Sequence, residues 1–160
     1  MESSDIIELG VNVGGARQIA RKLIQDSEIK ERPVSLWKII KYLQTQYELQ
    51  MLRFPFTDSI SGILVMEGDC MTIGFNENHP WCRRRFSIAH EIGHLLMGHL
   101  CKGEDKGSPA EIEAYKFAAE LLMPAEFFKK ELELDLDVLS KKYQVSKEAL
   151  CKRFIDCRML

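Results

Sequence analysis

The stretch RRRFSIAHEIGHLLMGH, residues Arg83 to His99, carries three of the four histidines of the chain on an otherwise apolar run. In a helix, where successive residues turn by about 100°, its apolar residues fall on one half of the surface. The titratable side chains His90, Glu91 and His94 fall together on the other half. The pattern therefore predicts an amphipathic helix that packs by one face and gathers ionisable groups on the other. The apolar half comprises Ile88, Ala89, Ile92, Leu95 and Leu96.

The residues from His90 to His94 form an H-E-x-x-H motif, which is typical of zinc hydrolases. Histidines one helical turn apart have Cβ atoms about 5–6 Å from each other. This separation suits two imidazole nitrogens that each lie about 2.0–2.1 Å from one zinc ion. Glu91 is displaced around the helix axis, so it would miss the metal and reach a water molecule held there. The motif predicts His90 and His94 as ligands and Glu91 as general base.

A zinc hydrolase needs a third protein ligand, for which Glu111 is the strongest candidate. In the next predicted helix Glu111 lies within the apolar stripe, where an ionised carboxylate is costly unless it is paired or metal-bound. The alternative is that Ser108 and Glu111 form a capping box, in which Glu111 serves only its own helix. Glu113 falls in the polar wedge of this helix, so we expect it to be solvated.

Two other histidines are weaker candidates for the third ligand. His99 points away from His90 if the helix continues, although Gly98 could end the helix and turn the chain. For His99 we expect packing or a surface role. His79 lies in a loop before a proline and has no helical register with the motif.

The composition of the chain is that of one globular domain. It has 160 residues, 46% of them hydrophobic, and a formal net charge of −2, which gives no bulk electrostatic reason for nucleic-acid or membrane binding. The only basic triplet, Arg83 to Arg85, is interpreted as a solvated helix start. The N-terminus lacks the pattern of a signal peptide, and the five cysteines include no CxxC pair. We expect a cytoplasmic protein with reduced thiols.

Periodicity predicts an α+β fold in which helices precede and follow a small antiparallel sheet. Residues 131–160 are expected to form a C-terminal helical hairpin packed on a main domain of residues 1–130, as a single structural unit. The hairpin has a helix-turn-helix outline, but the neutral charge favours plain packing. We expect helices over residues 16–25 and 35–43, from Trp81 onward, from Pro109 onward and in two C-terminal segments. The expected strands are ELQMLRF, ISGILVME and CMTIGFN. A tight turn at Gly68-Asp69 joins the last two strands.

These segments resemble the ImmA/IrrE family of metallopeptidases along nearly the whole chain. Members share an Arg-Phe-(Ser/Thr)-x-Ala-His-Glu-x-Gly-His segment, matched here by Arg85 through His94. A later Glu-x-Glu-Ala-x-x-Phe-Ala-x-x-Leu-Leu-Met-Pro segment is matched by Glu111 through Pro124. The resemblance implies a compact zincin-like domain with one Zn²⁺ held by His90, His94 and Glu111, and with Glu91 as base.

The resemblance also implies a substrate and partner, namely a helix-turn-helix repressor whose cleavage would derepress phage, mobile-element or stress genes. Tyr115 stands where many members have asparagine, and it is a candidate for orienting the site or donating to the oxyanion. An extended substrate could add to the strand that carries Thr72, Gly74 and Asn76.

Two other functions are compatible with these motifs. The chain could be a non-catalytic regulator that keeps zinc for structure and binds a repressor or DNA. It could also be a zinc amidohydrolase that acts on a small molecule, which the H-E-x-x-H motif alone permits.

Overall fold

The computed structural model describes residues 11–99 and 107–158, and its fold is α+β as predicted. The helices begin where the sequence provides caps: Ser35, Ser108 and Asp135 each accept a hydrogen bond from a backbone N–H of the first turn. The described elements are α2 (Val13–Asp26), α3 (Leu36–Leu43), β1 (Glu48–Phe54), β2 (Gly62–Glu67), β3 (Cys70–Asn76), α4 (Trp81–Leu96), α5 (Pro109–Leu122), α6 (Ala125–Phe128), α7 (Leu136–Tyr143) and α8 (Lys147–Arg158).

The sheet is mixed, with strand order β1-β3-β2, so the expectation of an antiparallel sheet was wrong for one of its two pairings. β2 and β3 form the predicted antiparallel hairpin, and Gly68 makes the turn with φ of +62°. β1 pairs with β3 in parallel. The alternation of apolar residues selects the buried face of a strand but leaves its direction open.

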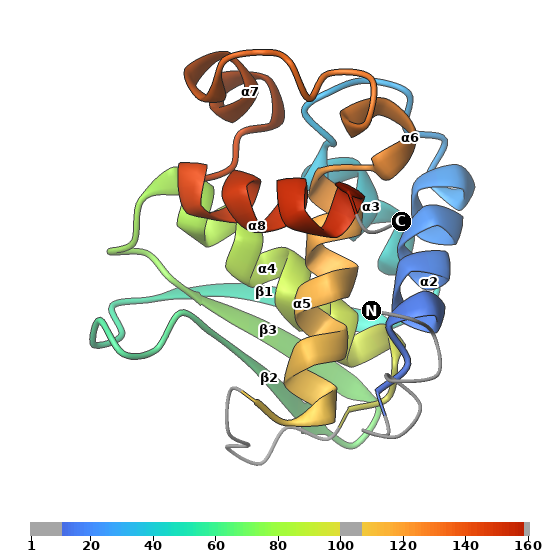
Figure 1. Cartoon of the computed structure of the whole chain (residues 1–160). Helices are drawn as coiled ribbons and strands as arrows, with labels where there is room; N and C mark the ends of the chain where they lie inside the picture. The colour runs from blue at the N-terminus through green and yellow to red at the C-terminus, as the bar shows by residue number, and fades with distance from the viewer. Residues whose placement is uncertain (1–10, 100–106, 159–160) are drawn as a thin grey trace.

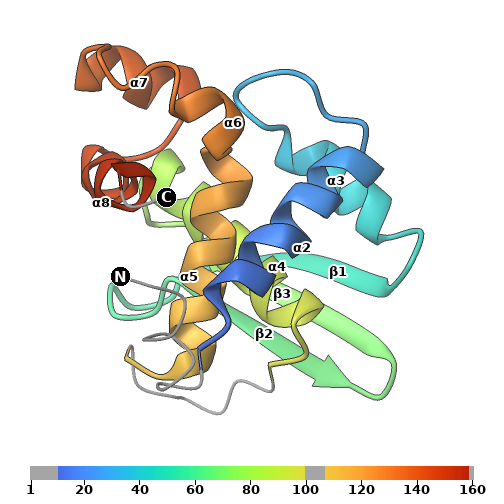
Figure 2. The same ribbon diagram turned by 45° about the vertical axis from the view of Figure 1, so that its right-hand side comes forward.

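Helix α4 lies between the sheet and α5 (Figure 1), and it contacts β2, β3 and α5. Helix α2 crosses α5 and packs against it (Figure 2). The inner face of the sheet contributes the buried residues Leu49, Leu64 and Ile73 to one hydrophobic core shared with α4 and α5. This layering brings the H-E-x-x-H helix beside both the β2 strand and the start of α5.

The C-terminal helices α7 and α8 contact each other. Two ion pairs link α8 to α5. Arg153 pairs with Glu120, and Lys116 Nζ lies 2.7 Å from Asp156 Oδ1. The side chains of Arg153 and Glu120 are buried. The division between residues 1–130 and 131–160 stays a prediction.

Arg85, the last residue of the basic triplet, is buried, which corrects the expectation that all three arginines are solvated. Its Nε donates to the carbonyl of Gln144 at 3.2 Å, and its Nη2 donates to that of Val34 at 3.1 Å. Burial lowers the pKa of Arg85. The guanidinium therefore satisfies carbonyl groups at the end of α7 and before α3, whereas Arg83 is exposed.

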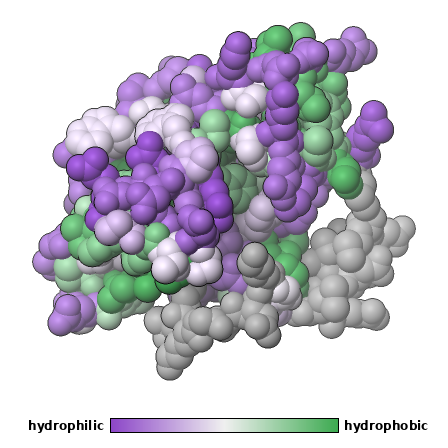
Figure 3. Space-filling view, turned by 90° about the vertical axis from the view of Figure 1, so that its left-hand side faces the viewer, coloured by the Kyte–Doolittle hydropathy of each residue, from purple (hydrophilic) through white to green (hydrophobic). Residues whose placement is uncertain are grey.

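Hydrophobic side chains reach the surface in separate patches among hydrophilic ones on the side of the molecule drawn in Figure 3. Among the described residues, no helix has the length and apolar character needed to cross a membrane. The four described cysteines, Cys70, Cys82, Cys151 and Cys157, are free thiols, and Cys101 lies outside the described residues.

Candidate metal centre

The two histidines of the H-E-x-x-H motif lie one turn apart on α4 and point to the same place. Their Nε2 atoms are 3.1 Å apart, and their rings meet edge to face with centroids 4.7 Å apart. His94 is almost fully buried, whereas the His90 side chain keeps 19% of its exposure. The site is therefore open to solvent on the His90 side.

Glu111 reaches both histidines from the first turn of α5. Its Oε2 lies 2.9 Å from His90 Nε2, and its Oε1 lies 2.9 Å from His94 Nε2. The backbone N–H of Glu111 donates to Ser108 Oγ at 3.3 Å, so Ser108 caps the helix. The Ser108 side chain thus caps α5, while the Glu111 carboxylate faces the two histidines.

These three side chains fit a divalent transition metal. One potential ligand atom from each of His90, His94 and Glu111 lies within 4.8 Å of the others. Two atoms bound tetrahedrally at 2.0–2.1 Å to one ion are about 3.3 Å apart, and the observed separations of 2.9–3.1 Å are close to this value. Two imidazoles and one carboxylate form a common donor set of catalytic zinc. Their role as ligands stays a prediction.

The protonation states also suit metal binding. Burial, assisted by the neighbouring His90, lowers the pKa of His94 to about 4, so its imidazole is neutral near pH 7. The hydrogen bond from His90 lowers the pKa of Glu111, which favours its carboxylate form. A neutral imidazole and an ionised carboxylate are the forms that bind a metal.

Glu91 lies beside these three residues and is buried under β2. Burial raises its pKa to about 7, with a further increase from Glu111 and a decrease from His90. Gly62, the first residue of β2, leaves room for this side chain: a Cβ there would lie 3.2 Å from Glu91 Cγ and 3.3 Å from Oε1. A desolvated carboxylate with a raised pKa is typical of a general base or acid.

Gly93 lets α4 and α5 approach closely enough for Glu111 to meet the histidines. A Cβ at this position would lie 2.8 Å from Phe117 Cδ1 and 3.3 Å from the Cα of Ala114. The small Ala114 and Ala118 are buried at this helix contact, as their spacing on α5 suggested. The distance between the two helices therefore depends on the absence of a side chain at Gly93.

We expect Gly93→Ala to destabilise the protein by about 1–3 kcal/mol, because the added methyl overpacks the contact between α4 and α5. Urea unfolding measures this loss. The matched control is Gly14→Ala in α2, where an added Cβ meets no heavy atom within 4 Å. Equal free energies of unfolding for the two variants would contradict the close-packing argument.

Glu113 differs from expectation, and it lies beside His99, which packs against His94. Glu113 was expected to be solvated, but its side chain is only 15% exposed, and its Oε2 lies 2.8 Å from His99 Nε2. His99 Nδ1 in turn lies 3.0 Å from His94 Nδ1. Helical register alone places Glu113 on a polar face, because register describes one helix and takes no account of His99 in the segment that follows α4.

Tyr115 lies one turn after Glu111 on α5, and its ring contacts side chains of α4 and α8. Its ring is 5.0 Å from that of Phe86, and Lys152 Nζ lies 5.4 Å from its centroid. Burial and the nearby Asp156 raise its pKa to about 12. A part for Tyr115 in orienting the site or stabilising an oxyanion stays a prediction.

The strand β3 cannot accept a substrate strand, which corrects the expectation for Thr72, Gly74 and Asn76. It is the central strand and pairs with β1 on one side and with β2 on the other. Asn76 is buried, and its Nδ2 lies 2.9–3.1 Å from the carbonyl oxygens of Phe56, Thr57 and Ile60. Within the described residues β2 pairs only with β3, so β2 offers the free edge nearest to Glu91.

The family follows from a comparison with protein-family models. The IrrE N-terminal-like domain, peptidase family M78, matches residues 44–154, which include the strands, the H-E-x-x-H helix, Glu111 and most of α8. The chain belongs to the ImmA/IrrE family. The resemblance seen in the sequence is thereby confirmed, and a peptidase role is supported. No curated protein matches the chain significantly.

The fold of the chain is also that of a solved structure. A Mycobacterium tuberculosis transcriptional regulator superposes with a TM-score of 0.68 at 16% sequence identity. The match covers 87% of this chain and 46% of that chain, so this chain spans less than half the length of the regulator. At this identity the likeness shows a shared fold.

Proposed function

We propose that this ImmA/IrrE protein is a zinc-dependent endopeptidase. The observation that carries the proposal is the convergence of His90, His94 and Glu111 from two helices, with the buried Glu91 beside them. The match to a peptidase family supports the reaction class.

In the proposed reaction, the residues of this chain hold the ion and move one proton. His90 and His94, through Nε2, and Glu111, through its carboxylate, would hold the zinc. A bound zinc ion would supply Lewis acidity toward a peptide carbonyl and toward water. Glu91 would accept a proton from the attacking water on a carboxylate oxygen and donate it to the nitrogen of the leaving amine. Its burial beneath Gly62 strengthens it as a base.

The free edge of β2 supports a polypeptide as the substrate. An extended peptide can add to an exposed edge by backbone hydrogen bonds. β2 begins at Gly62, next to Glu91, and its side chains Ile63, Val65 and Met66 are each more than 40% exposed. An added strand would therefore lie beside the base and contact apolar side chains.

For the natural substrate we propose a helix-turn-helix transcriptional repressor in the cytoplasm. The ImmA/IrrE membership supports this choice. The structural neighbour is itself described as a transcriptional regulator, which agrees with a part in gene control. Cleavage would release the genes that the repressor silences.

The test is cleavage of a helix-turn-helix repressor, for which a repressor gene next to that of this chain is the first source. The zinc-loaded protein is incubated with the purified repressor, and products are measured by mass spectrometry. We expect one pair of fragments that a zinc chelator prevents. A stable complex without fragments would instead favour the non-catalytic regulator, and cleavage of small amides alone would favour the amidohydrolase.

A further inference from the structure

A line of hydrogen bonds leads from His94 away from the candidate ligand cluster. His94 Nε2 faces Glu111 and His90, and its other ring nitrogen, Nδ1, lies 3.0 Å from Nδ1 of His99. His99 Nε2 lies 2.8 Å from Glu113 Oε2. Glu113 Oε1 accepts a hydrogen bond of 2.9 Å from the backbone N–H of Asn12.

The end of α4 explains why His99 can reach back to His94. Gly98 adopts φ of +68°, a left-handed conformation that favours glycine. The N–H of Gly98 then donates to the carbonyl of Leu95 at 3.3 Å, and the N–H of His99 donates to that of His94 at 2.9 Å. This pair of bonds is a Schellman motif. It folds the chain so that the His99 ring meets the His94 ring, with centroids 5.2 Å apart.

Glu113 sets the direction of the hydrogen bonds. A carboxylate only accepts hydrogen bonds, so His99 must donate to it from Nε2. The Nδ1 of a neutral His99 is then an acceptor, and His94 must donate to it from Nδ1. This leaves the lone pair of His94 on Nε2, the atom that faces His90 and Glu111.

We propose that His99 and Glu113 are positioning residues that fix the tautomer and ring orientation of His94 for metal binding. The inference rests on the proposed zinc site. The side chains of both residues are well shielded, with 14% and 15% exposure, so water competes weakly for their hydrogen bonds. Partners of this kind typically change metal affinity about 10- to 100-fold.

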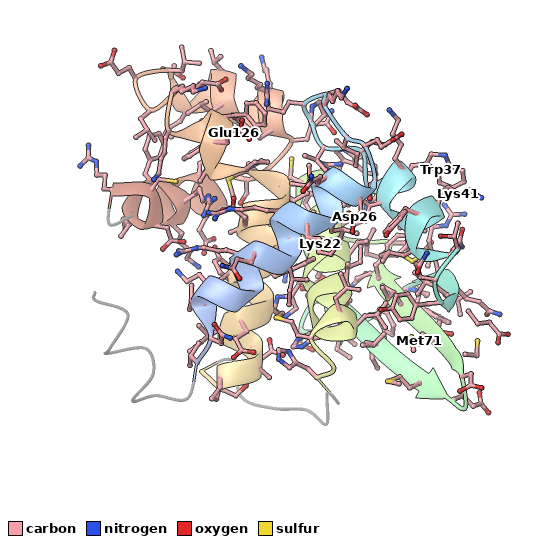
Figure 4. All side chains as sticks on the ribbon, turned by 90° about the vertical axis from the view of Figure 1, so that its right-hand side faces the viewer. Lys22, Asp26, Trp37, Lys41, Met71 and Glu126 are labelled. Atoms are coloured by element: carbon pink, nitrogen blue, oxygen red, sulfur yellow. The ribbon has the colours of Figure 1, made fainter. Side chains whose placement is uncertain are left out.

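The first experiment measures the zinc dissociation constant of the full chain by competition with a chromophoric chelator. We expect His99→Leu and Glu113→Ala to weaken binding about 10- to 100-fold. His99→Asn should retain most of the affinity, because its Oδ1 replaces Nδ1 as the acceptor for His94. The matched control is Glu126→Ala, which removes an exposed glutamate on α6, beyond the opposite end of α5 from Glu111 (Figure 4).

The second experiment uses the unaltered, zinc-loaded protein, so it does not depend on whether a variant folds. Long-range ¹⁵N–¹H spectra of the imidazoles report which nitrogen carries the proton. We expect His99 protonated on Nε2 alone and His94 on Nδ1 alone, with the His94 proton protected from solvent exchange.

The outcomes separate the inference from the proposed function. If the wild-type protein binds zinc and both His99→Leu and Glu113→Ala bind it with the same affinity as wild type, the inference is overturned. The proposed zinc site would then still stand. A His99 ring protonated on Nδ1 would also overturn it. Failure of the wild-type protein to bind zinc would overturn the proposed function, and the inference with it.

Discussion

Replacing Glu91 with glutamine is expected to abolish peptide-bond hydrolysis while zinc binding remains. The amide has the shape of the carboxylate but cannot accept the proton of the attacking water, and loss of a general base typically slows a reaction by about 100- to 10,000-fold. Glu91 is not among the three residues that meet as potential ligands, which are His90, His94 and Glu111. The rate of repressor fragmentation and the zinc content per chain measure the two effects separately.

The control for this variant is Glu126→Gln, which makes the same chemical change at an exposed position. We expect its cleavage rate and zinc content to match those of wild type. If Glu91→Gln cleaves the repressor as fast as this control does, Glu91 is not the base. If it loses zinc as well as activity, its role is in holding the metal.

Replacing Glu120 with glutamine is expected to lower the free energy of unfolding by about 3–5 kcal/mol, because it leaves the buried charge of Arg153 without its partner. Both side chains are at most 1% exposed. Glu120 also accepts from Arg21 Nε at 3.0 Å and from the backbone N–H of Ala125 at 3.2 Å. One carboxylate thus joins α2, the start of α6 and α8 to α5.

Urea unfolding measures this loss, and the exposed pair of Glu148 and Lys152 on α8 provides the control. The side chains of that pair are 80% and 55% exposed, so Glu148→Gln should change the free energy of unfolding by less than about 1 kcal/mol. A similar small effect of Glu120→Gln would show that the buried pair contributes little to stability.

The same pair predicts a pH dependence. Burial by itself raises the pKa of Glu120, but the charge and hydrogen bond of Arg153 and the hydrogen bonds from Arg21 and the Ala125 N–H outweigh it and lower the pKa below its ordinary value. A folded-state pKa below that of the unfolded chain gives stability above the unfolded pKa of about 4.3, and acidification removes it. We expect the difference in stability between wild type and Glu120→Gln to shrink as the pH falls below this value.

The sequence by itself determined the elements of this fold and the residues of the candidate centre. The predicted strand ELQMLRF coincides with β1, and the turn at Gly68 joins β2 to β3. His90, Glu91 and His94 could be placed together because one helix fixes their relation at 3.6 residues per turn. Such local regularities require no knowledge of other segments.

Only the tertiary structure decided which segments approach these local elements. The parallel pairing of β1 made β3 the central strand and left the free edge near Glu91 to β2. The turn at Gly98 brought His99 to His94 and to Glu113, although helical register placed Glu113 on a polar face. Periodicity describes one segment at a time, whereas burial and hydrogen bonding depend on neighbours distant in the sequence.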